Sequence, residues 1–413
     1  MPPEKLKNNQ ATNSAAAAVA ACEDLMLCVL ARLPVKSIFR FKSVCKPWNH
    51  LFSTQEFIKM QVKLSSESKN QSFLVHNMNG NNELISVFNI ESNKKKAKIL
   101  DHPFDYTQVR IDIVGCCRGL VCIKRGKGFV LWNPAMNLFK TVSPLKNHNS
   151  VRLGFGYDAE GDDFKVVRIV LKYKRNFGIC VSWVEVYSVN SNSWTTIHLG
   201  FEFSKLKIYR KSISAIVNGN PYWVGKIGVI KKDVLICFDM SKLVFKIVPL
   251  SSLDYNKAKL DIKFVDLNGS LGALVSTWKN EERIEYVDSW VFDDAEQIWT
   301  KSHSVGPIQV QMIRVLRCLK DGRVLGLHPS GKLIVFNSET NCVKGLFNVG
   351  HEYFRIYDYT ASLAYIQGME KVKLKKRRDH WNKSKVLGVC LFSIMLIVSN
   401  LKFLSSSRTG NKH

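Results

Sequence analysis

The sequence predicts an α+β protein, in which a small helical module is followed by a large domain made almost wholly of β-strands. Two observations predict this fold class. Apolar residues recur at helical spacing between about residues 22 and 62, whereas alternating and short apolar runs separated by turn residues fill residues 70–366. With 413 residues, 46% of them hydrophobic, the chain is also long enough to form two or more folded domains.

Two further segments flank these domains in the sequence. Residues 1–21 lack the apolar core of a secretory signal, and we expect them to be a disordered leader. Residues 367–413 form a basic tail: from Lys371 onward, 11 basic residues stand against one acid, a net of +10 within the formal net charge of +26. In this tail, Val386 to Leu401 is an uncharged run of 16 residues, shorter than the ~20 residues of a typical membrane-spanning helix.

The tail is open to several interpretations. It is compatible with a C-terminal membrane anchor whose basic flank keeps the body in the cytosol. It also fits a nuclear import signal, a contact with anionic lipid, or an appendage without function. Eleven cysteines at irregular spacing, with no CxxC pair, favour reduced thiols. We therefore expect a cytoplasmic or nuclear protein, with the membrane anchor as the alternative.

The helical module is expected to contain three short helices. The first presents one apolar face and ends before Pro34, because proline disfavours helical geometry in the residue that precedes it. Ser37 is the expected N-cap of the second helix, and Pro47 is expected to interrupt it. Ser53 and Glu56 have the spacing of a capping box at the start of the third. The apolar face of the first helix is formed by Leu25, Val29, Leu30 and Leu33.

This module resembles an F-box. The motif residues are Glu23-Asp24-Leu25, Leu30, Leu33-Pro34-Val35-Lys36-Ser37, Arg40-Phe41-Lys42, Val44-Cys45-Lys46 and Trp48. In that family the module binds the Skp-type adaptor of a cullin–RING ubiquitin ligase. The family usually has Leu-Pro just before the Glu-Asp-Leu segment, where this chain has Ala21-Cys22, and that departure affects one edge of the contact. The resemblance implies adaptor-facing or module-core roles for Leu25, Leu30, Leu33, Pro34, Val35, Cys45 and Trp48.

The β region contains a repeat. Each copy has a strand that ends in an aromatic residue, then Asn, Ser or Asp with a polar turn, and a second aromatic residue or Val seven positions after the first. The two side chains of each copy can then pack across a hairpin. The paired positions are Trp132/Phe139, Tyr187/Trp194, Phe238/Phe245, Phe292/Trp299 and Phe336/Val343, with a degraded sixth copy at Phe88/Lys95.

The length of this repeat predicts the architecture. Successive first aromatics stand 44 to 55 residues apart, which suits the blades of a kelch-like β-propeller. Six copies predict six blades, and the alternative is a hairpin-rich sandwich or barrel. The double glycine of standard kelch repeats is absent. Asn218-Gly219, ahead of Pro221, is a strong signal for a two-residue hairpin turn.

The same region resembles the F-box-associated domain that is common in plant F-box proteins. The ordered motifs include Gly119-Leu120-Val121, Leu131-Trp132-Asn133-Pro134, Phe155-Gly156-Tyr157-Asp158, Asp163-Phe164-Lys165-Val166-Val167 and Val186-Tyr187-Ser188. In that family the domain recruits the protein to be ubiquitinated. The resemblance thus implies a non-catalytic substrate-recognition subunit of an SCF-type (Skp–cullin–F-box) E3 ubiquitin ligase, with a target that the sequence does not name. Candidate aromatic anchors for a target on the loops and rim of a propeller are Trp183, Tyr209, Trp223, Trp278, Trp290 and Tyr353, although most of them are expected in the blade cores instead.

The sequence lacks several common motifs of catalysis and phosphate binding. It contains no GxxxxGK[ST], HExxH or GxSxG motif, and no cofactor or metal is expected. His102, near Asp101 and Asp105, is expected in a solvated loop. The net charge of +26 supports a second hypothesis, a basic scaffold that associates with RNA or membrane without any ligase role.

Overall fold

The computed structural model describes most of the chain up to Val372. The segment Lys373–His413 is a separate unit that lies outside the described residues, as does the predicted leader. The described residues are 25–68, 71–79, 82–91, 97–103, 111–145, 151–175, 178–198, 203, 206–208, 215–227, 233–253, 260–279, 283–350 and 354–372. Among these residues, no helix is long and apolar enough to cross a membrane.

The helical module contains four short helical segments where the sequence predicted three. Residues 25–31 are helical and are followed by α2 (Val35–Phe41), α3 (Lys46–Leu51) and α4 (Gln55–Glu67). The additional segment arises because Pro47 lies in the first turn of α3, where no backbone N–H is required. Pro47 therefore helps to begin a helix.

The caps of two helices also differ from the prediction. Pro34, and not Ser37, is the N-cap residue of α2, because that helix begins two residues earlier than its sequence signal. At α4 the cap is Thr54, whose Oγ1 accepts a hydrogen bond of 3.3 Å from the N–H of Phe57. The hydroxyl of Ser53 instead donates to the carbonyl of Asn49 in the preceding helix. Ser and Thr are adjacent here and both suit a cap, so only the backbone geometry selects between them.

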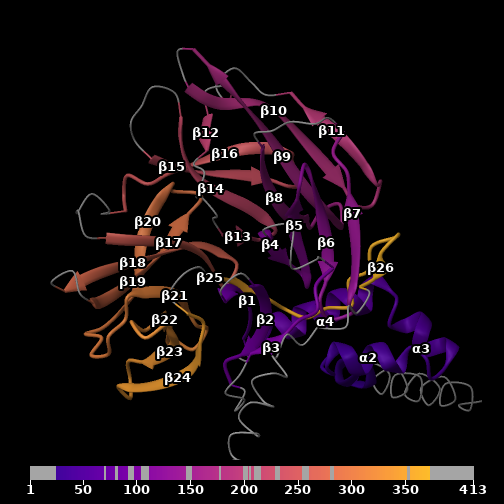
Figure 1. The fold of residues 1–413 in the computed structure, drawn as a ribbon, viewed down its shortest axis with the longest axis horizontal. Helices are drawn as coiled ribbons and strands as arrows, with labels where there is room; N and C mark the ends of the chain where they lie inside the picture. Colours follow the sequence, from indigo (N-terminus) through magenta and orange to yellow (C-terminus); the bar gives the residue numbers. More distant parts are fainter. Residues whose placement is uncertain are drawn as a thin grey trace, which may run out of the picture. The chain divides into compact units, whose positions relative to one another are not determined.

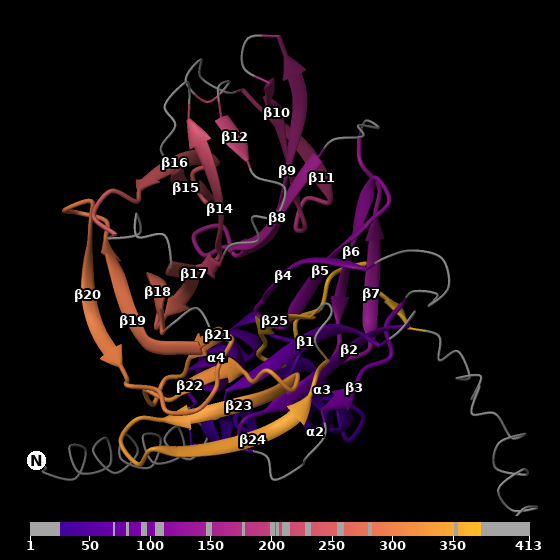
Figure 2. The same cartoon turned by 60° about the vertical axis from the view of Figure 1, so that its left-hand side comes forward.

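The strands form six antiparallel sheets in a ring, a six-bladed β-propeller arrangement (Figures 1 and 2), as the repeat predicted. Blade 1 contains β1 (Ser72–Asn79), β2 (Asn82–Asn89), β3 (Lys98–Ile99) and the late strand β25 (Phe354–Asp358). Blade 2 contains β4 (Asp112–Cys117), β5 (Leu120–Arg125), β6 (Gly128–Asn133), β7 (Leu138–Val142) and β26 (Glu370–Lys371). Blade 3 contains β8 (Val151–Asp158), β9 (Asp163–Lys174), β10 (Gly178–Ser188) and β11 (Ser193–Ile197).

The remaining three blades continue the ring. Blade 4 contains β12 (Leu206–Ile208), β13 (Ile216–Val217), β14 (Asn220–Ile227), β15 (Asp233–Asp239) and β16 (Val244–Pro249). Blade 5 contains β17 (Leu260–Leu267), β18 (Ser270–Lys279), β19 (Arg283–Asp293) and β20 (Ile298–Val305). Blade 6 contains β21 (Arg314–Cys318), β22 (Val324–Leu327), β23 (Lys332–Asn337) and β24 (Cys342–Asn348).

The two ends of the β domain meet in blade 1. There β25 pairs with β1, with Leu74 opposite Tyr357, so a strand from the end of the domain closes the ring against a strand from its beginning. A second late strand, β26, pairs with β7 at the outer edge of blade 2. Between them, the amide of Asn133 donates to the carbonyls of Ser362 and Ala364. The last described residues therefore bridge two blades.

The register confirms the five complete copies of the repeat. The predicted partners lie directly opposite each other on neighbouring strands in all five: Trp132/Phe139, Tyr187/Trp194, Phe238/Phe245, Phe292/Trp299 and Phe336/Val343. Ring centroids are 5.0 Å apart in the Phe238 pair and 5.1 Å in the Phe292 pair, which is contact distance for aromatic pairs. In the sixth copy Phe88 is buried in β2, and Lys95 lies outside the described residues.

The turns explain why each copy continues with Asn, Ser or Asp. At the end of β15, Asp239 Oδ1 accepts hydrogen bonds from the N–H groups of Ser241 and Lys242, and Asp293 repeats this in blade 5. Each turn then ends in a residue with positive φ, the conformation that reverses the chain. These residues are Asn137, Asn192, Leu243, Gln297 and Asn341. The predicted turn Asn218-Gly219 also has positive φ at both residues and joins β13 to β14.

The hairpin turns lie on two faces of the ring. Within each blade neighbouring strands are antiparallel, so turns from the first to the second and from the third to the fourth strand share a face. The turns from the second to the third strand lie on the other face. Helix α4 packs on the face that carries the turns from the first to the second strand. There Lys59 contacts Asp162 in the β8–β9 turn, and Gln61 contacts the carbonyl of Ala361. We call these two surfaces the α4 face and the opposite face.

Candidate functional site

The helical module has its own small core. Leu30 and Val35 are buried, together with Ile38 and Phe52. Trp48 is half-buried, with its ring centroid 5.5 Å from that of Phe41 and 5.8 Å from that of Phe52. The predicted site residues Leu30 and Val35 therefore belong to the core of the module, and Trp48 packs against that core.

The other predicted site residues reach the surface. Leu25 is 66% exposed, and Pro34 and Cys45 are exposed as well, while Leu33 is half-buried. Leu25 and Val29 are one helical turn apart, and Val29 is 55% exposed. The first helix therefore does not bury the single face that its spacing predicted. Leu30 turns inward, and Leu25 and Val29 turn outward.

Three further exposed apolar residues were not singled out as site residues from the sequence. Met26 lies beside Leu25, Phe39 lies on α2, and Val44 in the turn after α2 is 64% exposed. A small module that leaves this many apolar side chains in solvent has the character of a binding surface. The signal was present in the sequence as a surplus of apolar residues in a module too small to bury them all. Which of them remain exposed depends on the packing of α4 and the propeller.

Helix α4 joins the module to the propeller by polar contacts along its length. Lys59 Nζ lies 2.7 Å from Asp162 Oδ2, and the buried amide of Gln61 donates to the carbonyl of Ala361 at 3.2 Å. Near its C-terminal end, the carbonyl of Ser66 accepts a hydrogen bond from the ammonium of Lys320 in blade 6. One apolar cluster also continues from Phe52 and the module into blades 2 and 3. The module and the propeller thus share a core.

Asp162 is the centre of a charged cluster at this junction. Burial by itself raises the pKa of its carboxyl, but hydrogen bonds from Lys59 and Tyr157 outweigh burial, and the pKa lies below its ordinary value. Burial of the Tyr157 phenol and its hydrogen bond to Asp162 raise the pKa of Tyr157. The ring of Tyr157 lies 3.7 Å from the guanidinium of Arg118. At neutral pH the cluster therefore contains a carboxylate between two cations, with a neutral phenol.

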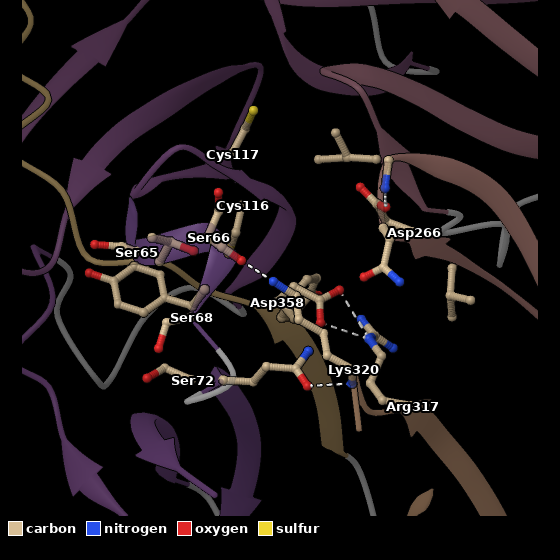
Figure 3. Close-up of a pocket in the computed structure, with 18 of the residues that line it drawn as sticks. Ser65, Ser66, Ser68, Ser72, Cys116, Cys117, Asp266, Arg317, Lys320 and Asp358 are labelled. Carbon is tan, nitrogen blue, oxygen red and sulfur yellow. Dashed lines mark hydrogen bonds and ion pairs between the residues drawn. The ribbon is translucent and has the colours of Figure 1, made fainter. Parts of the chain in front are cut away.

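A large pocket of about 2580 Å³ lies between α4 and the inner strands of the propeller (Figure 3). The guanidinium of Arg317 donates to both carboxylate oxygens of Asp358 at 3.0 Å, and the N–H of Lys320 donates to the amide of Gln71 at 2.9 Å. Ser65, Ser66 and Ser68 line it from α4 and the residue that follows. Arg317, Asp358 and Lys320 are thus engaged with neighbouring residues of the pocket.

The thiols in the pocket are not activated. Burial raises the pKa of Cys117 to about 12 and that of Cys116 well above its ordinary value. Both are therefore protonated at neutral pH, and a protonated thiol is a poor nucleophile. Within the described part of the chain, no three His, Cys, Asp or Glu side chains are grouped so that they could hold a metal ion.

His102 differs from the prediction. It is buried, and not in a solvated loop, with 6% of its surface exposed. Burial, together with the nearby His76, lowers the pKa of its imidazole to about 4, so the ring is neutral at physiological pH. Asp105, its other proposed neighbour, lies outside the described residues.

The candidate aromatic anchors fall into three groups. Trp223 is buried within the propeller core, so it cannot act as an anchor without rearrangement. Trp183, Trp278 and Trp290 are half-buried. Tyr209 and Tyr353 lie outside the described residues. Tyr173, which the sequence did not single out, is the most exposed aromatic residue described, at 75%.

Comparison with protein families identifies both parts of the chain. Residues 22–60 match the model of the F-box domain, and residues 55–366 match that of the F-box associated beta propeller domain. The second match begins at the first helical residue of α4, in agreement with the packing of that helix against the propeller. Together the two matches cover most of the chain.

Curated relatives in Arabidopsis thaliana have the same combination. An F-box protein is 29% identical over 250 residues, which are 55% of this chain and 59% of the relative. An F-box/kelch-repeat protein is 28% identical over 353 residues, or 79% of this chain and 88% of the relative. Another F-box/kelch-repeat protein is 28% identical over 307 residues, which are 67% of this chain and 72% of the relative.

Proposed function

Because the chain belongs to the family of F-box proteins with an F-box associated β-propeller domain, we propose that it is the substrate-recognition subunit of an SCF-type E3 ubiquitin ligase. In this proposal the F-box binds a Skp-type adaptor, and the propeller holds a target protein close to the ubiquitin carrier. The subunit itself performs no chemistry. It acts by raising the effective concentration of target lysines at the carrier.

The observation that supports this function best is the exposed apolar surface of the F-box. Leu25 and Val29 remain in solvent on the first helix although the module has a core of its own. Such residues stabilise an interface when a partner buries them, at roughly 25 cal/mol per Å² of apolar surface. The shared core along α4 supports the second half of the proposal, since it ties the F-box and the propeller together.

The first test is co-expression of the full chain with a Skp-type adaptor, followed by size-exclusion chromatography. We expect a one-to-one complex that Val29→Asp disrupts, because a carboxylate at this site would lose its hydration in the interface. Leu33→Asp combined with Pro34→Ala is expected to weaken the complex as well, and it also perturbs the module.

The matched control is Val244→Asp. Val244 is 45% exposed, close to the 55% of Val29, but it lies on β16 of the propeller. It should leave the complex intact. If the wild-type chain is folded and the adaptor elutes separately, the ligase proposal is wrong, and the basic RNA- or membrane-associated scaffold takes its place.

The proposed location is the cytoplasm or the nucleus, with a C-terminal membrane anchor as the alternative. The nine described cysteines are all unpaired, which is usual in reducing compartments. Residues 386–401 lie outside the described residues. Cell fractionation of the full chain, compared with a chain that ends at Val372, distinguishes the proposed location from the membrane anchor. If the tail is an anchor, only the full chain sediments with membranes.

A further inference from the structure

The charge of the propeller is divided between its two faces. Turns on the α4 face are acidic, because their carboxylates accept hydrogen bonds from the turn N–H groups. The carboxylates that accept these bonds are Asp158, Asp163, Asp239 and Asp293. Further acids, Glu160, Asp162, Asp294 and Glu296, lie in the same turns. Turn chemistry therefore accounts for many of the acids on this face.

The opposite face carries several exposed cations of blades 2 and 3. In blade 2, Arg125 and Lys127 flank Gly126 in the β5–β6 turn, and both are exposed. In blade 3, Lys172 and Arg175 are exposed at the end of the β9–β10 hairpin. Residues 120–129 and 171–184 contain no acid. Each turn is therefore basic along its own sequence, and contacts between β4 and β8 show that their blades are neighbours.

The β9–β10 hairpin also extends past its neighbours in the sheet. Pairing of β9 with β8 ends at Val170, and pairing of β10 with β11 ends at Val184, but β9 and β10 continue to pair as far as Lys174 and Gly178. This end of the hairpin lies at the top of both overall views (Figures 1 and 2). Within the described residues, neither β8 nor β11 pairs with this extension.

On one face of the extension, the side chains change from buried to exposed between two successive cross-strand pairs. Leu171 is paired with Val181, and both are buried in the cluster of apolar residues that includes Leu206 of blade 4. The next pair on the same face is Tyr173 with Ile179, and these are 75% and 57% exposed. An aromatic and an aliphatic residue thus stand in solvent near the end of the hairpin that carries Lys172 and Arg175.

We propose that the Tyr173–Ile179 pair, with the basic turns of blades 2 and 3, binds an acidic segment of the target protein that also carries an apolar side chain. This inference rests on the proposed function and adds to it the class of partner and the surface. Exposed cations on one surface speed association with an acidic partner. An exposed Tyr beside an aliphatic residue gives the apolar anchor that such an interface needs. The surface faces away from α4, and so from the F-box.

The test uses the full chain in complex with the adaptor and a defined probe. The probe is a fluorescein-labelled 15-residue peptide of Glu and Asp with one Leu and one Phe, and its dissociation constant is measured by fluorescence anisotropy. Lys172→Glu with Arg175→Glu is expected to weaken binding roughly tenfold at low salt, the product of a few-fold loss at each site. Affinity for the wild-type chain should fall as the salt concentration rises.

The matched control reverses the charge of two exposed lysines on the α4 face. Lys63→Glu with Lys242→Glu makes the same change in net charge, on α4 itself and in a turn of the α4 face. The peptide should bind this variant within about twofold of the wild type. Equal losses in the two double variants would mean that only net charge matters, and the proposed surface would be wrong.

The apolar half of the proposal has its own readout. Tyr173→Ser with Ile179→Ser should weaken binding of the Leu- and Phe-containing peptide by about tenfold and leave an all-acidic peptide almost unchanged. A 15-nucleotide single-stranded RNA is measured in parallel. If it binds more tightly than the peptide, and Lys172→Glu with Arg175→Glu abolishes its binding, the surface is one for nucleic acid and the proposal is overturned.

Chromatography of the same preparations separates this proposal from the function on which it rests. A stable adaptor complex that does not bind the peptide refutes the surface and leaves the ligase role in place. A chain that binds the peptide through Tyr173 and Arg175 but does not bind the adaptor refutes the ligase role, and it keeps the surface as a site for acidic protein segments.

Discussion

Residues at turns set both the geometry and the charge of the propeller. An Asp or Asn at the end of a strand binds the N–H groups of the turn that follows, and a residue with positive φ then completes the reversal. Asp162 has this second role in the β8–β9 turn, with φ of 50°, and it also forms the ion pair with Lys59 of α4. A single side chain thus shapes a hairpin and joins the F-box helix to the ring.

These two roles of Asp162 can be separated by substitution. Asp162→Asn keeps a residue that accepts positive φ and removes only the charge, so we expect a loss of at most about 1 kcal/mol in the free energy of unfolding, since both partners are partly exposed. Asp162→Ala should cost roughly 1 kcal/mol more, because alanine disfavours positive φ. Urea unfolding of the full chain measures both. Equal losses would show that backbone conformation contributes little here.

At the scale of elements, each complete blade depends on the hairpin between its third and fourth strands. In blade 5, Trp299 packs against Phe292, and its indole N–H donates to the carbonyl of Pro249 in blade 4 at 2.8 Å. Trp299, the second aromatic residue of its repeat, therefore stabilises its own hairpin and also connects blade 5 to blade 4. This explains why the repeat was visible in the sequence at all.

Trp299→Ala is expected to cost about 3–5 kcal/mol, because it removes a buried ring and leaves a cavity between two blades. The neighbouring residue Ile298 provides the control, since it is 44% exposed on the same strand. Ile298→Ala should change the free energy of unfolding by roughly 0.5 kcal/mol or less. Denaturant unfolding monitored by circular dichroism distinguishes the two, and similar losses would contradict the proposed role of the repeat.

At the scale of the whole molecule, the ring is closed by the end of the chain's β domain. β25 pairs with β1, and the segment after it is held by Asn133 and by β7. Without β25, blade 1 would present an unpaired edge toward the centre of the ring. Helix α4 then covers part of one face of the ring.

Truncation tests this closure. A chain that ends at Val372 keeps β25 and β26, and it should melt within a few degrees of the full chain. A chain that ends at Gly350 loses both strands, and we expect it to aggregate or to lose its cooperative transition, because an unpaired inner strand exposes backbone hydrogen-bonding groups. Thermal melting and limited proteolysis of the two chains provide the measurement. A soluble, cooperative shorter chain would show that β25 is dispensable.

The sequence by itself determined the features that depend on neighbours along the chain. The helical module, the five aromatic pairs and the Asn218-Gly219 turn could all be predicted, because hairpin register and turn conformation are set within a few residues. The tertiary structure decided the rest. Whether Leu25 or Leu30 faces the core, where α4 lies, how β25 closes the ring and which turns share a face all depend on contacts between residues far apart in sequence. For that reason the exposed surface of the F-box and the basic face of the propeller became visible only in three dimensions.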